Sequence, residues 1–404
     1  MSDRFLIFIF CLAEVLGMLG ISSFAALLPE MQAEWGLNNA DASWITGIYF
    51  FGYLLAVPVL VGLTDRMDAK RIYLASAALG GASLLGFALL ADGFWSGLFF
   101  RSLSGVALAG TYMPGLKALT DRVGEGIRPR AVAFYTASFG IGGSLSFLIS
   151  GEAAALWSWQ AAFAITALGT PFSMALAAYA MTARRGIAHA KPKTHLLDFR
   201  PVFRNREAMA YIAAYTAHNF ELFGFRGWIV AFLVFSQSLQ PDYAGWNVIV
   251  IVTVITFLAV PASVIGGELA MRYGRRPLLI AVMTVSAIIA ACIGFTGAAP
   301  FPLVVGVAIL YGAFISADSA AITTGAINAA PPGGRGAVMA VHSSIGFMGS
   351  FLGPLAFGLV LDAAGADHLL GWGLAFAAMG AGVIMGPLAL TLLIKKSSKG
   401  VRHL

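Results

Sequence analysis

The sequence predicts an all-α integral membrane protein, with twelve transmembrane helices in two pseudo-symmetric six-helix bundles. Three observations predict this fold class. Of the 404 residues, 59% are hydrophobic and only 11% are charged, which is more apolar surface than a water-soluble core can bury. Twelve apolar runs are long enough to cross a bilayer, which takes about 20 residues. Features of the first six runs also recur in the last six.

The runs follow one another with short polar connections, at residues 5–30, 43–64, 71–91, 94–119, 131–155, 160–183, 208–236, 246–270, 276–296, 301–329, 336–361 and 371–394. An even number of runs places both termini on one side. Every Lys and Arg outside the runs falls on that side, so the positive-inside rule predicts cytoplasmic termini in a multi-pass protein of the cell (inner or plasma) membrane. Tryptophans gather at the other ends, as an interfacial belt predicts: Trp35, Trp44, Trp95, Trp157, Trp159, Trp246 and Trp372.

Charge and cysteine content exclude several other classes. The pI is near 9.4, but the basic residues are spread over loops between runs, which favours orientation and contact with anionic lipid over nucleic-acid binding. Cys11 and Cys292 lie inside apolar runs, so neither a disulfide framework nor a metal site is predicted. The run after Arg4 is too long for a cleavable signal and contains Glu14, which suits a first spanning helix. We expect no cofactor.

The chain divides into two related halves. The polar stretch 184–207 is expected to be a cytoplasmic linker between an N-terminal bundle at 1–183 and a C-terminal bundle at 208–404. Residues matched between the halves lie about 203–207 positions apart: Leu55 to Pro58 with Leu258 to Pro261, Glu14 with Glu221, Arg130 with Arg335, and Gly140 and Gly143 with Gly346 and Gly349. Such repeats are typical of transporters with a site between the two units. Two runs of glycines are expected to be sliding faces between the halves. They are Gly140, Gly142 and Gly143 in the fifth apolar run, and Gly346, Gly349 and Gly353 in the eleventh.

With this repeat, the loop motifs resemble those of the major facilitator superfamily. Its loop signature Gly-x-Leu-x-Asp-Arg-x-Gly-Arg-Arg is matched in part after the second run, at Leu63, Asp65, Arg66, Lys70 and Arg71. A second copy after the eighth run keeps Gly267, Leu269, Arg272, Gly274, Arg275 and Arg276, with Met271 in place of the acid. The family's fourth-span pattern appears as Arg101 and Gly105. The fifth run lacks the Gly-Pro pair of drug/proton antiporters, which disfavours drug efflux.

The resemblance implies a conformational latch at the cytoplasmic ends of the helices. Asp65 is expected either to pair with Arg122 or to face the positive end of the eleventh helix. The alternative is a solvated turn. Met271 cannot repeat the contact, so the latch is expected in the N-terminal half only. The residues assigned to it are Asp65, Arg66, Arg71, Arg122, Arg272, Arg275 and Arg276.

Ionisable side chains inside the apolar runs indicate where a transport site lies. Such a side chain costs at least about 2.5–3.5 kcal/mol at the bilayer centre, so it usually faces a cavity or a partner. In the family, the first, fourth, seventh and tenth spans line the central cavity, and these spans hold Glu14, Arg101, Glu221, Arg226 and Asp318. We expect these side chains to converge there. Glu14 and Arg101 lie at similar depths and are expected to pair.

Arg226 suits an anionic substrate, because a guanidinium grips a carboxylate with two parallel hydrogen bonds. The residues expected to bind substrate are Arg226, Arg101, Asp318, Asn219, Tyr112 and Trp228, although the aromatic members are equally suited to packing between helices. His218 and Glu221 stand three residues apart and so share a helix face. A carboxylate beside an imidazole can take up and release protons. Proton coupling is therefore assigned to Glu14, Glu221 and His218, with Asp318 as an alternative carrier. Glu152 and Glu268 lie near run ends and are expected to be solvated.

The sequence therefore predicts a monomeric secondary active transporter that moves a small organic solute by alternating access, coupled to protons, and favours an anion as substrate. The alternative is proton-driven efflux of drug-like cationic or neutral compounds, which would use Glu14, Glu221 and Asp318. An enzyme is not predicted, since no nucleophile with a base and no metal-ligand spacing is present. An ATP-driven pump would need a phosphate-binding loop, which the sequence lacks. A non-transporting receptor of the same fold is a further alternative.

Overall fold

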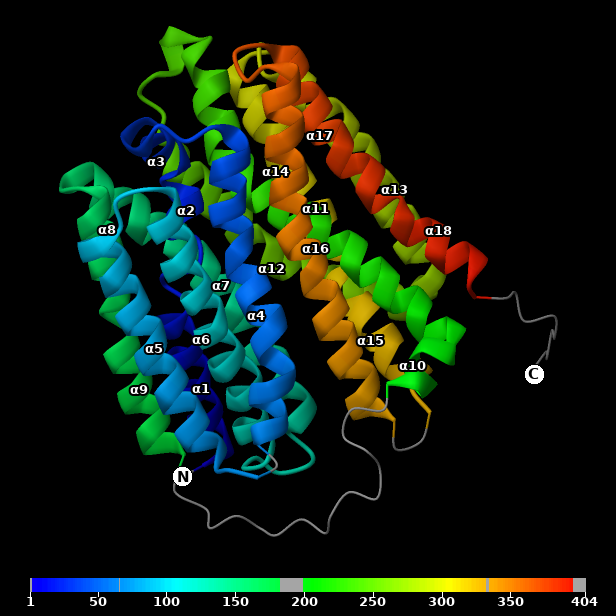
Figure 1. Cartoon of the computed structure of the whole chain (residues 1–404). Helices are drawn as coiled ribbons and strands as arrows, with labels where there is room; N and C mark the ends of the chain where they lie inside the picture. Colours follow the sequence, from blue (N-terminus) through cyan, green and yellow to red (C-terminus); the bar gives the residue numbers. More distant parts are fainter. Residues whose placement is uncertain (1, 65, 182–198, 332–333, 395–404) are drawn as a thin grey trace.

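The computed structural model describes residues 2–64, 66–181, 199–331 and 334–394. Within these ranges every regular element is a helix, and the helices stand side by side as long rods in two groups (Figure 1). The predicted all-α class is confirmed. The predicted linker at 184–207 and Asp65 fall largely or wholly outside the described residues.

Six rods form the N-terminal half. The first is interrupted and consists of α1 (Asp3–Gly17), α2 (Ser23–Ala26) and α3 (Leu28–Trp35). The next rods are α4 (Asn39–Leu63), α5 (Ala69–Leu90), α6 (Phe94–Thr120) and α7 (Arg128–Leu156), and the sixth joins α8 (Trp159–Ala167) to α9 (Gly169–Ala180).

Six further rods form the C-terminal half. They are α11 (Arg206–Ser238), α12 (Val248–Tyr273), α13 (Arg275–Ile293) with η2 (Gly294–Thr296), α14 (Phe301–Ala317) with α15 (Ser319–Ala329), α16 (Arg335–Ala364), and α17 (Leu369–Val383) with α18 (Met385–Leu392). The short α10 (Arg200–Arg204) precedes this set, and η1 (Pro241–Tyr243) lies between α11 and α12.

The rods account for twelve membrane spans. In the described part of the chain, ten rods are long and apolar enough to cross a membrane by length and composition alone. The other two are the interrupted first rod and α6, which carries the charges of Arg101 and Lys117. The twelve-span fold class predicted from the hydrophobic runs is therefore confirmed.

The two ends of the bundle differ in composition. Apart from Arg101 and Arg226, the described Lys and Arg residues lie at or near the helix ends on the side where α1 begins and α4 ends, which we name the basic end. The other side, where α3 ends and α4 begins, is the opposite end, and it carries the tryptophans at positions 35, 44, 95, 157, 159, 246 and 372.

The halves touch mainly along two pairs of helices, α4 with α16 and α7 with α12, and the short α2 and α3 also contact α11. In Figure 1, α4 and α16 run beside each other through the middle of the molecule. Their contacts begin at the opposite end, where Asn39 meets Asp362, and continue to mid-bundle, where the rings of Tyr53 and Phe347 lie 4.2 Å apart. The α7–α12 contacts begin with Glu152 and Asn247 and reach Gly140 and Val260.

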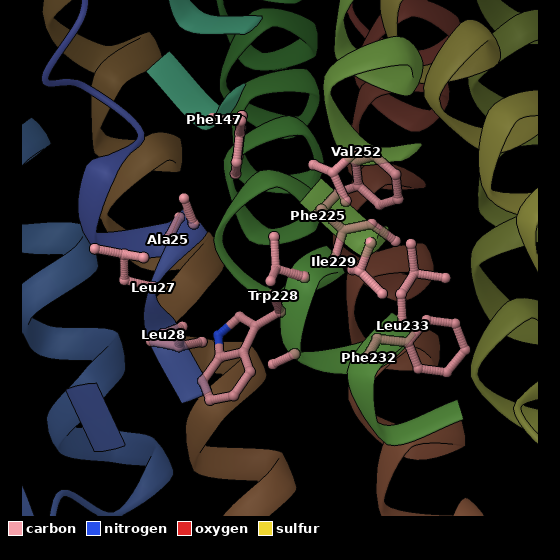
Figure 2. Close-up of a cluster of buried hydrophobic side chains, with 14 of the residues drawn as sticks. Ala25, Leu27, Leu28, Phe147, Phe225, Trp228, Ile229, Phe232, Leu233 and Val252 are labelled. Carbon is pink, nitrogen blue, oxygen red and sulfur yellow. The ribbon is translucent and has the colours of Figure 1, made fainter. Parts of the chain in front are cut away.

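Helix α11 is the most enclosed rod, and this fixes the position of the polar groups on it. Figure 2 shows its apolar face, with Phe225, Trp228, Ile229, Phe232 and Leu233 buried against neighbouring rods. Side chains from the first rod join the same cluster: Ala25, Leu27 and Leu28. Packing of this kind on both sides restricts rotation of α11 about its axis, because protein interiors are close-packed.

The glycine runs do not play the symmetric role expected of them. Gly140 faces Val260 across the interface between the halves, but Gly142 packs against Met18 of its own half. Gly346, Gly349 and Gly353 of α16 all pack against α11 of the same half, so a Cβ on Gly349 would lie 2.1 Å from the carbonyl oxygen of Thr216. The second run is therefore a tight helix contact within the C-terminal half, and the prediction of a sliding face there was wrong.

Candidate functional site

A small pocket between the halves brings together the two intramembrane arginines. Its walls come from the first rod, α4, α6, α7 and α11: Ile21, Ser22, Ala25, Thr46, Phe50, Arg101, Phe147, Phe223, Arg226 and Gly227. We name it the arginine pocket. Its volume is about 20 Å³, enough for about one water molecule. No carboxylate is among its wall residues.

Arg101 closes the gap in the first rod. Its Nη1 donates to the carbonyl oxygen of Gly20 at 3.3 Å, and its Nη2 donates to that of Ile21 at 3.0 Å. These carbonyls lie in the non-helical segment between α1 and α2, where no helical N–H is available to bond them. The sequence predicted an unbroken span at 5–30, and the buried guanidinium is what allows the interruption.

Tyr49 and Gly105 set the place of Arg101. The guanidinium carbon lies 4.5 Å from the centroid of the Tyr49 ring, in cation–π contact. A Cβ on Gly105 would lie 1.7 Å from the carbonyl oxygen of Tyr49, so only glycine allows α4 and α6 to approach this closely. Arg101 is only 2% exposed, and its Nε has no hydrogen-bond partner among the described residues. Because Arg101 lies on the pocket wall, this unpaired donor is available to a ligand in the pocket.

Arg226 reaches the same pocket from the other half. Its guanidinium carbon lies 5.9 Å from the Phe223 ring centroid, and a Cβ on Gly143 of α7 would lie 3.6 Å from its Nη1. It is half-buried, and it makes no hydrogen bond or ion pair within the described ranges. A guanidinium with five donors in such a place is suited to a ligand that supplies acceptors.

Glu14 does not pair with Arg101, contrary to the sequence-based expectation. Its Oε2 accepts a hydrogen bond of 2.8 Å from the hydroxyl of Tyr135 on α7, and its Oε1 has no partner in the described part of the chain. The Tyr135 hydroxyl also lies 3.2 Å from the carbonyl oxygen of Tyr112. The separation has a simple cause: Arg101 binds the carbonyls past the end of α1, whereas Glu14 is still inside that helix.

Glu221 points into the C-terminal half and away from the arginine pocket. Its Oε1 accepts hydrogen bonds from Ser286 of α13 at 2.8 Å and from Tyr311 of α14 at 3.0 Å. Five residues along α11 separate it from Arg226, which is about 140° of rotation at 3.6 residues per turn. The expected convergence of all five charges on one cavity is therefore met by the two arginines and not by Glu14, Glu221 or Asp318.

His218 pairs with Asp318 and not with Glu221, its neighbour one turn further along α11. The Nδ1 of His218 lies 2.7 Å from an oxygen of Asp318, and both side chains are buried. Asp318 stands at the break between α14 and α15. Tyr215 stacks between the two imidazoles, with ring centroids 6.0 Å from His218 and 3.9 Å from His342. We name His218, Asp318, Tyr215 and His342 the histidine cluster. It lies in the C-terminal half and is separate from the arginine pocket.

The remaining expected site residues have varied surroundings. Asn219 is buried, and its amide nitrogen has no partner among the described residues. Tyr112 stacks on Tyr135 at 5.7 Å, beside Glu14. Trp228 lies in apolar packing outside the pocket wall: it stacks on Phe357 and donates its indole N–H to the carbonyl oxygen of Pro354 at 3.3 Å.

The latch expected at the basic end cannot be traced, because Asp65 lies outside the described residues. Of its predicted partners, Arg122 donates to the carbonyl oxygen of Ala118 at 2.9 Å, and Arg276 donates to that of Thr391 at 3.4 Å. Arg272 lies over the Tyr273 ring at 5.6 Å. Arg66, Arg71 and Arg275 lie at the same end.

Four residues that the sequence did not single out contribute to these sites: Tyr49, Tyr135, Ser286 and Thr46. The available signal was weak, because a hydroxyl in an apolar run can bond to its own helix, as Thr46 does to Ala42. No group of three His, Cys, Asp or Glu side chains in the described ranges is arranged to hold a metal ion.

Comparison with known proteins finds transporters among the relatives of this chain. The human (Homo sapiens) voltage-gated purine nucleotide uniporter SLC17A9 is 25% identical over 301 residues, 68% of this chain and 67% of that protein. The 3-(3-hydroxy-phenyl)propionate transporter of Escherichia coli (strain K12) is 35% identical over 130 residues, 32% of each chain. The chain thus spans from about a third to two thirds of these relatives' length.

The fold has a close solved counterpart. A crystal structure of a bacterial homolog of the human lysosomal transporter Spinster, in an inward-facing and unoccupied conformation, superposes with a TM-score of 0.75. It shares 16% sequence identity and covers 97% of this chain and 96% of that one. The sequence model of the Major Facilitator Superfamily matches residues 10–240 and 220–403. The chain therefore belongs to the Major Facilitator Superfamily, a group of membrane transporters and not of enzymes.

Proposed function

We propose that this protein is a secondary active transporter of small organic anions and that Arg101 and Arg226 bind the anionic group. The observation that carries the proposal is that one arginine from each half opens onto the same pocket, whose wall holds no carboxylate. A charged side chain in the membrane normally has a partner. An anionic substrate would be the partner that Arg226 lacks among the described residues.

The rest of the pocket wall favours an organic anion over an inorganic one. Phe50, Phe147 and Phe223 supply apolar surface, and the rings of Phe50 and Phe223 lie 4.2 Å apart across the two halves. Pockets for organic ligands combine such surface with a few placed polar groups. The arginine pocket, which at about 20 Å³ has room for about one water molecule, would have to widen to admit such a ligand. The named substrates of two relatives, a purine nucleotide and a hydroxyphenylpropionate, are also organic anions. The absence of an acid from the wall disfavours the alternative, efflux of a cationic drug.

Alternating access fits the way the halves touch. Their contacts extend from the opposite end to mid-bundle, as between Asn39 and Asp362 and between Tyr53 and Phe347. The positive-inside rule places the basic end in the cytoplasm, so this arrangement corresponds to an inward-facing state. The likeness to an inward-facing neighbour supports this assignment. We propose that the protein acts as a monomer in the cell membrane with both termini cytoplasmic.

Proton coupling is best assigned to the histidine cluster. An imidazole and a carboxylate 2.7 Å apart at a helix break can hold or release a proton as access to water changes. The titratable groups around this pair are Tyr215 and His342 on one side and Glu221 with Tyr311 on the other. Glu14 and Glu221 are held by hydroxyl groups of their own halves, so we assign them a supporting part.

A binding measurement tests the anion assignment. We expect purified protein to bind a small aromatic carboxylate and to be indifferent to its uncharged amide and to an amine of the same shape. Arg226→Ala should weaken binding by roughly 10- to 100-fold, since a charge-assisted bond is worth about 1.5–3 kcal/mol. Arg226→Lys should weaken it less, because the charge is kept while the paired hydrogen bonds are lost.

Arg130→Ala is the matched control, since Arg130 is exposed at the basic end of α7. Its binding should equal that of the unaltered protein. Preferential binding of the amine, or undiminished carboxylate binding by Arg226→Ala, would contradict the assignment and favour the efflux alternative.

A further inference from the structure

Two hydrogen-bonded contacts join the halves at the opposite end. On α16, one carboxylate oxygen of Asp362 accepts from the backbone nitrogen of Asn39 at 3.1 Å and from its Nδ2 at 2.8 Å. The other oxygen accepts from the backbone nitrogen of Ala40 at 2.7 Å. On α7, Glu152 accepts from the Nδ2 of Asn247 at 2.7 Å. Each contact therefore pairs a carboxylate of one half with an asparagine of the other.

The two contacts are related by the internal repeat. Both carboxylates lie near the end of the fifth rod of their half, and they are 210 residues apart in the sequence. Both asparagines lie at the start of the second rod of the other half, 208 residues apart. These separations are close to the 203–207 residues between the matched motifs. The same contact is thus made twice, once in each direction across the interface.

We propose that these two contacts form a paired latch that holds the halves closed at the opposite end. Because each acid and its asparagine belong to different halves, the opposite end cannot open until both contacts break. The latch belongs to the conformational cycle and does not depend on which substrate is carried. Glu152, which the sequence analysis left as a solvated side chain, is one half of it.

The two contacts differ in strength. Asp362 accepts three hydrogen bonds, two of them from backbone N–H groups in the first turn of α4, where the helix dipole favours an anion. Gln32 holds the amide of Asn39 in place by donating to its Oδ1 at 2.9 Å. Glu152 accepts a single bond, from an amide whose Oδ1 is already used to cap α12 at Val250. Most of the effect should therefore come from Asp362.

Distances between spin labels on the two halves can test the latch without a substrate. The chain offers label sites where an added side chain meets nothing within 4 Å: Gly93 and Gly245 at the opposite end, and Gly126 and Gly336 at the basic end. Each pair is changed to Cys in full-length protein in which Cys11 and Cys292 are replaced by Ser. The protein is then measured in lipid nanodiscs.

The most selective variants are Asn39→Asp and Asn247→Asp. Both keep the shape of the side chain, and the carboxylate introduced by Asn247→Asp can still cap α12, but each variant places a carboxylate against the existing acid. We expect the distance between positions 93 and 245 to lengthen and that between 126 and 336 to shorten. The ratio of open to closed molecules at the opposite end should rise roughly five- to tenfold for Asn39→Asp and less for Asn247→Asp.

Reversing one of the two pairs should restore the latch. The double variant Asn247→Asp/Glu152→Gln regains an amide facing a carboxylate, so its distances should return toward those of the unaltered protein. Asn39→Asp/Asp362→Asn should stay open, because an amide in place of the Asp362 carboxylate cannot accept from both backbone N–H groups. Asp367→Asn, at an exposed acid of the same end, is the control and should change neither distance. Unchanged distances in both Asp variants, or an Asn247→Asp/Glu152→Gln variant as open as Asn247→Asp, would overturn the proposal.

Discussion

Arg101 and Arg226 show how far single residues indicate function. Both were singled out because a permanent charge inside an apolar run needs a partner, and both lie in the arginine pocket. Their partners were not predictable from the sequence. Arg101 binds two backbone carbonyls, which carry no signal in the sequence because every residue has one. The pairing of Glu14 with Arg101, inferred from depth alone, is not formed.

The partner of His218 was also not predictable from the sequence. Its spacing from Glu221 indicated a pair one turn apart on one helix. The structure pairs His218 with Asp318 of another rod, while Glu221 bonds Ser286 and Tyr311. Residues three apart on a helix differ in direction by about 60°. That is enough to aim one side chain at α13 and α14 and the other at the break that follows α14.

We predict that His218→Gln and Asp318→Asn uncouple transport from protons. The imidazole and the carboxylate are the groups that can exchange a proton, and the arginine pocket is left intact by either change. In proteoliposomes, accumulation driven by a pH gradient should be lost, while exchange of labelled for unlabelled substrate at equal pH should persist. His368→Gln, at an exposed histidine of the opposite end, should behave as the unaltered protein. Undiminished gradient-driven accumulation in both variants would contradict the assignment.

At the scale of the helix, the length of the apolar runs predicted the rods well but did not predict their interruptions. The first rod stops at Gly17 and resumes at Ser23, and the tenth is broken at Asp318. A hydropathy profile does not reveal such breaks, because most residues within them are as apolar as those around them. At the first break another rod supplies a partner for the freed polar groups, since Arg101 binds the carbonyls of Gly20 and Ile21.

Close helix contact at Gly105 yields a prediction about stability. A Cβ there would lie 1.7 Å from the carbonyl oxygen of Tyr49, so Gly105→Ala must push α4 and α6 apart. We expect destabilisation of roughly 3 kcal/mol, the upper part of the range for overpacked sites, seen as a drop of roughly 3–5 °C in the thermal unfolding midpoint.

Gly62→Ala is the matched control on α4, since an added Cβ at this position meets nothing within 4 Å. It should leave the midpoint unchanged or raise it slightly, because alanine is the better helix former. Equal midpoints for the two variants would show that the α4–α6 contact is looser than the structure has it.

At the scale of the whole molecule, the duplicated halves meet through α4 with α16 and α7 with α12. The repeat was visible in the sequence from motifs 203–207 residues apart. Its consequence at the interface, the reciprocal contacts Asp362–Asn39 and Glu152–Asn247, was not, because such a contact depends on how the two halves are docked. The latch expected at the basic end would be the counterpart of these contacts in the other state of the cycle.

We predict that Asp65→Asn slows transport without reducing expression. Removal of this charge should weaken closure of the basic end, whichever of its two expected partners it binds, and so lower the population of the outward-open state. Initial rates of uptake in proteoliposomes should fall several-fold at an unchanged amount of protein. Asp68→Asn is the control, because it removes a nearby negative charge at the residue that caps α5 through the backbone nitrogen of Lys70. Its uptake rate should equal that of the unaltered protein. Full activity of Asp65→Asn would refute the prediction.

The sequence by itself determined the membrane location, the twelve spans, the repeat and the short set of buried charges. The spans and the buried charges follow from hydropathy and charge, which are read from neighbouring residues. The repeat follows from matched motifs along the chain, and none of these properties needs knowledge of packing. The tertiary structure alone decided that the arginines converge, that Glu14 and Glu221 turn inward to hydroxyl groups, and that Asp318 joins His218. Partner choice depends on the rotation of each rod about its axis. Close contacts between rods, as at Gly105 and Gly349, set that rotation.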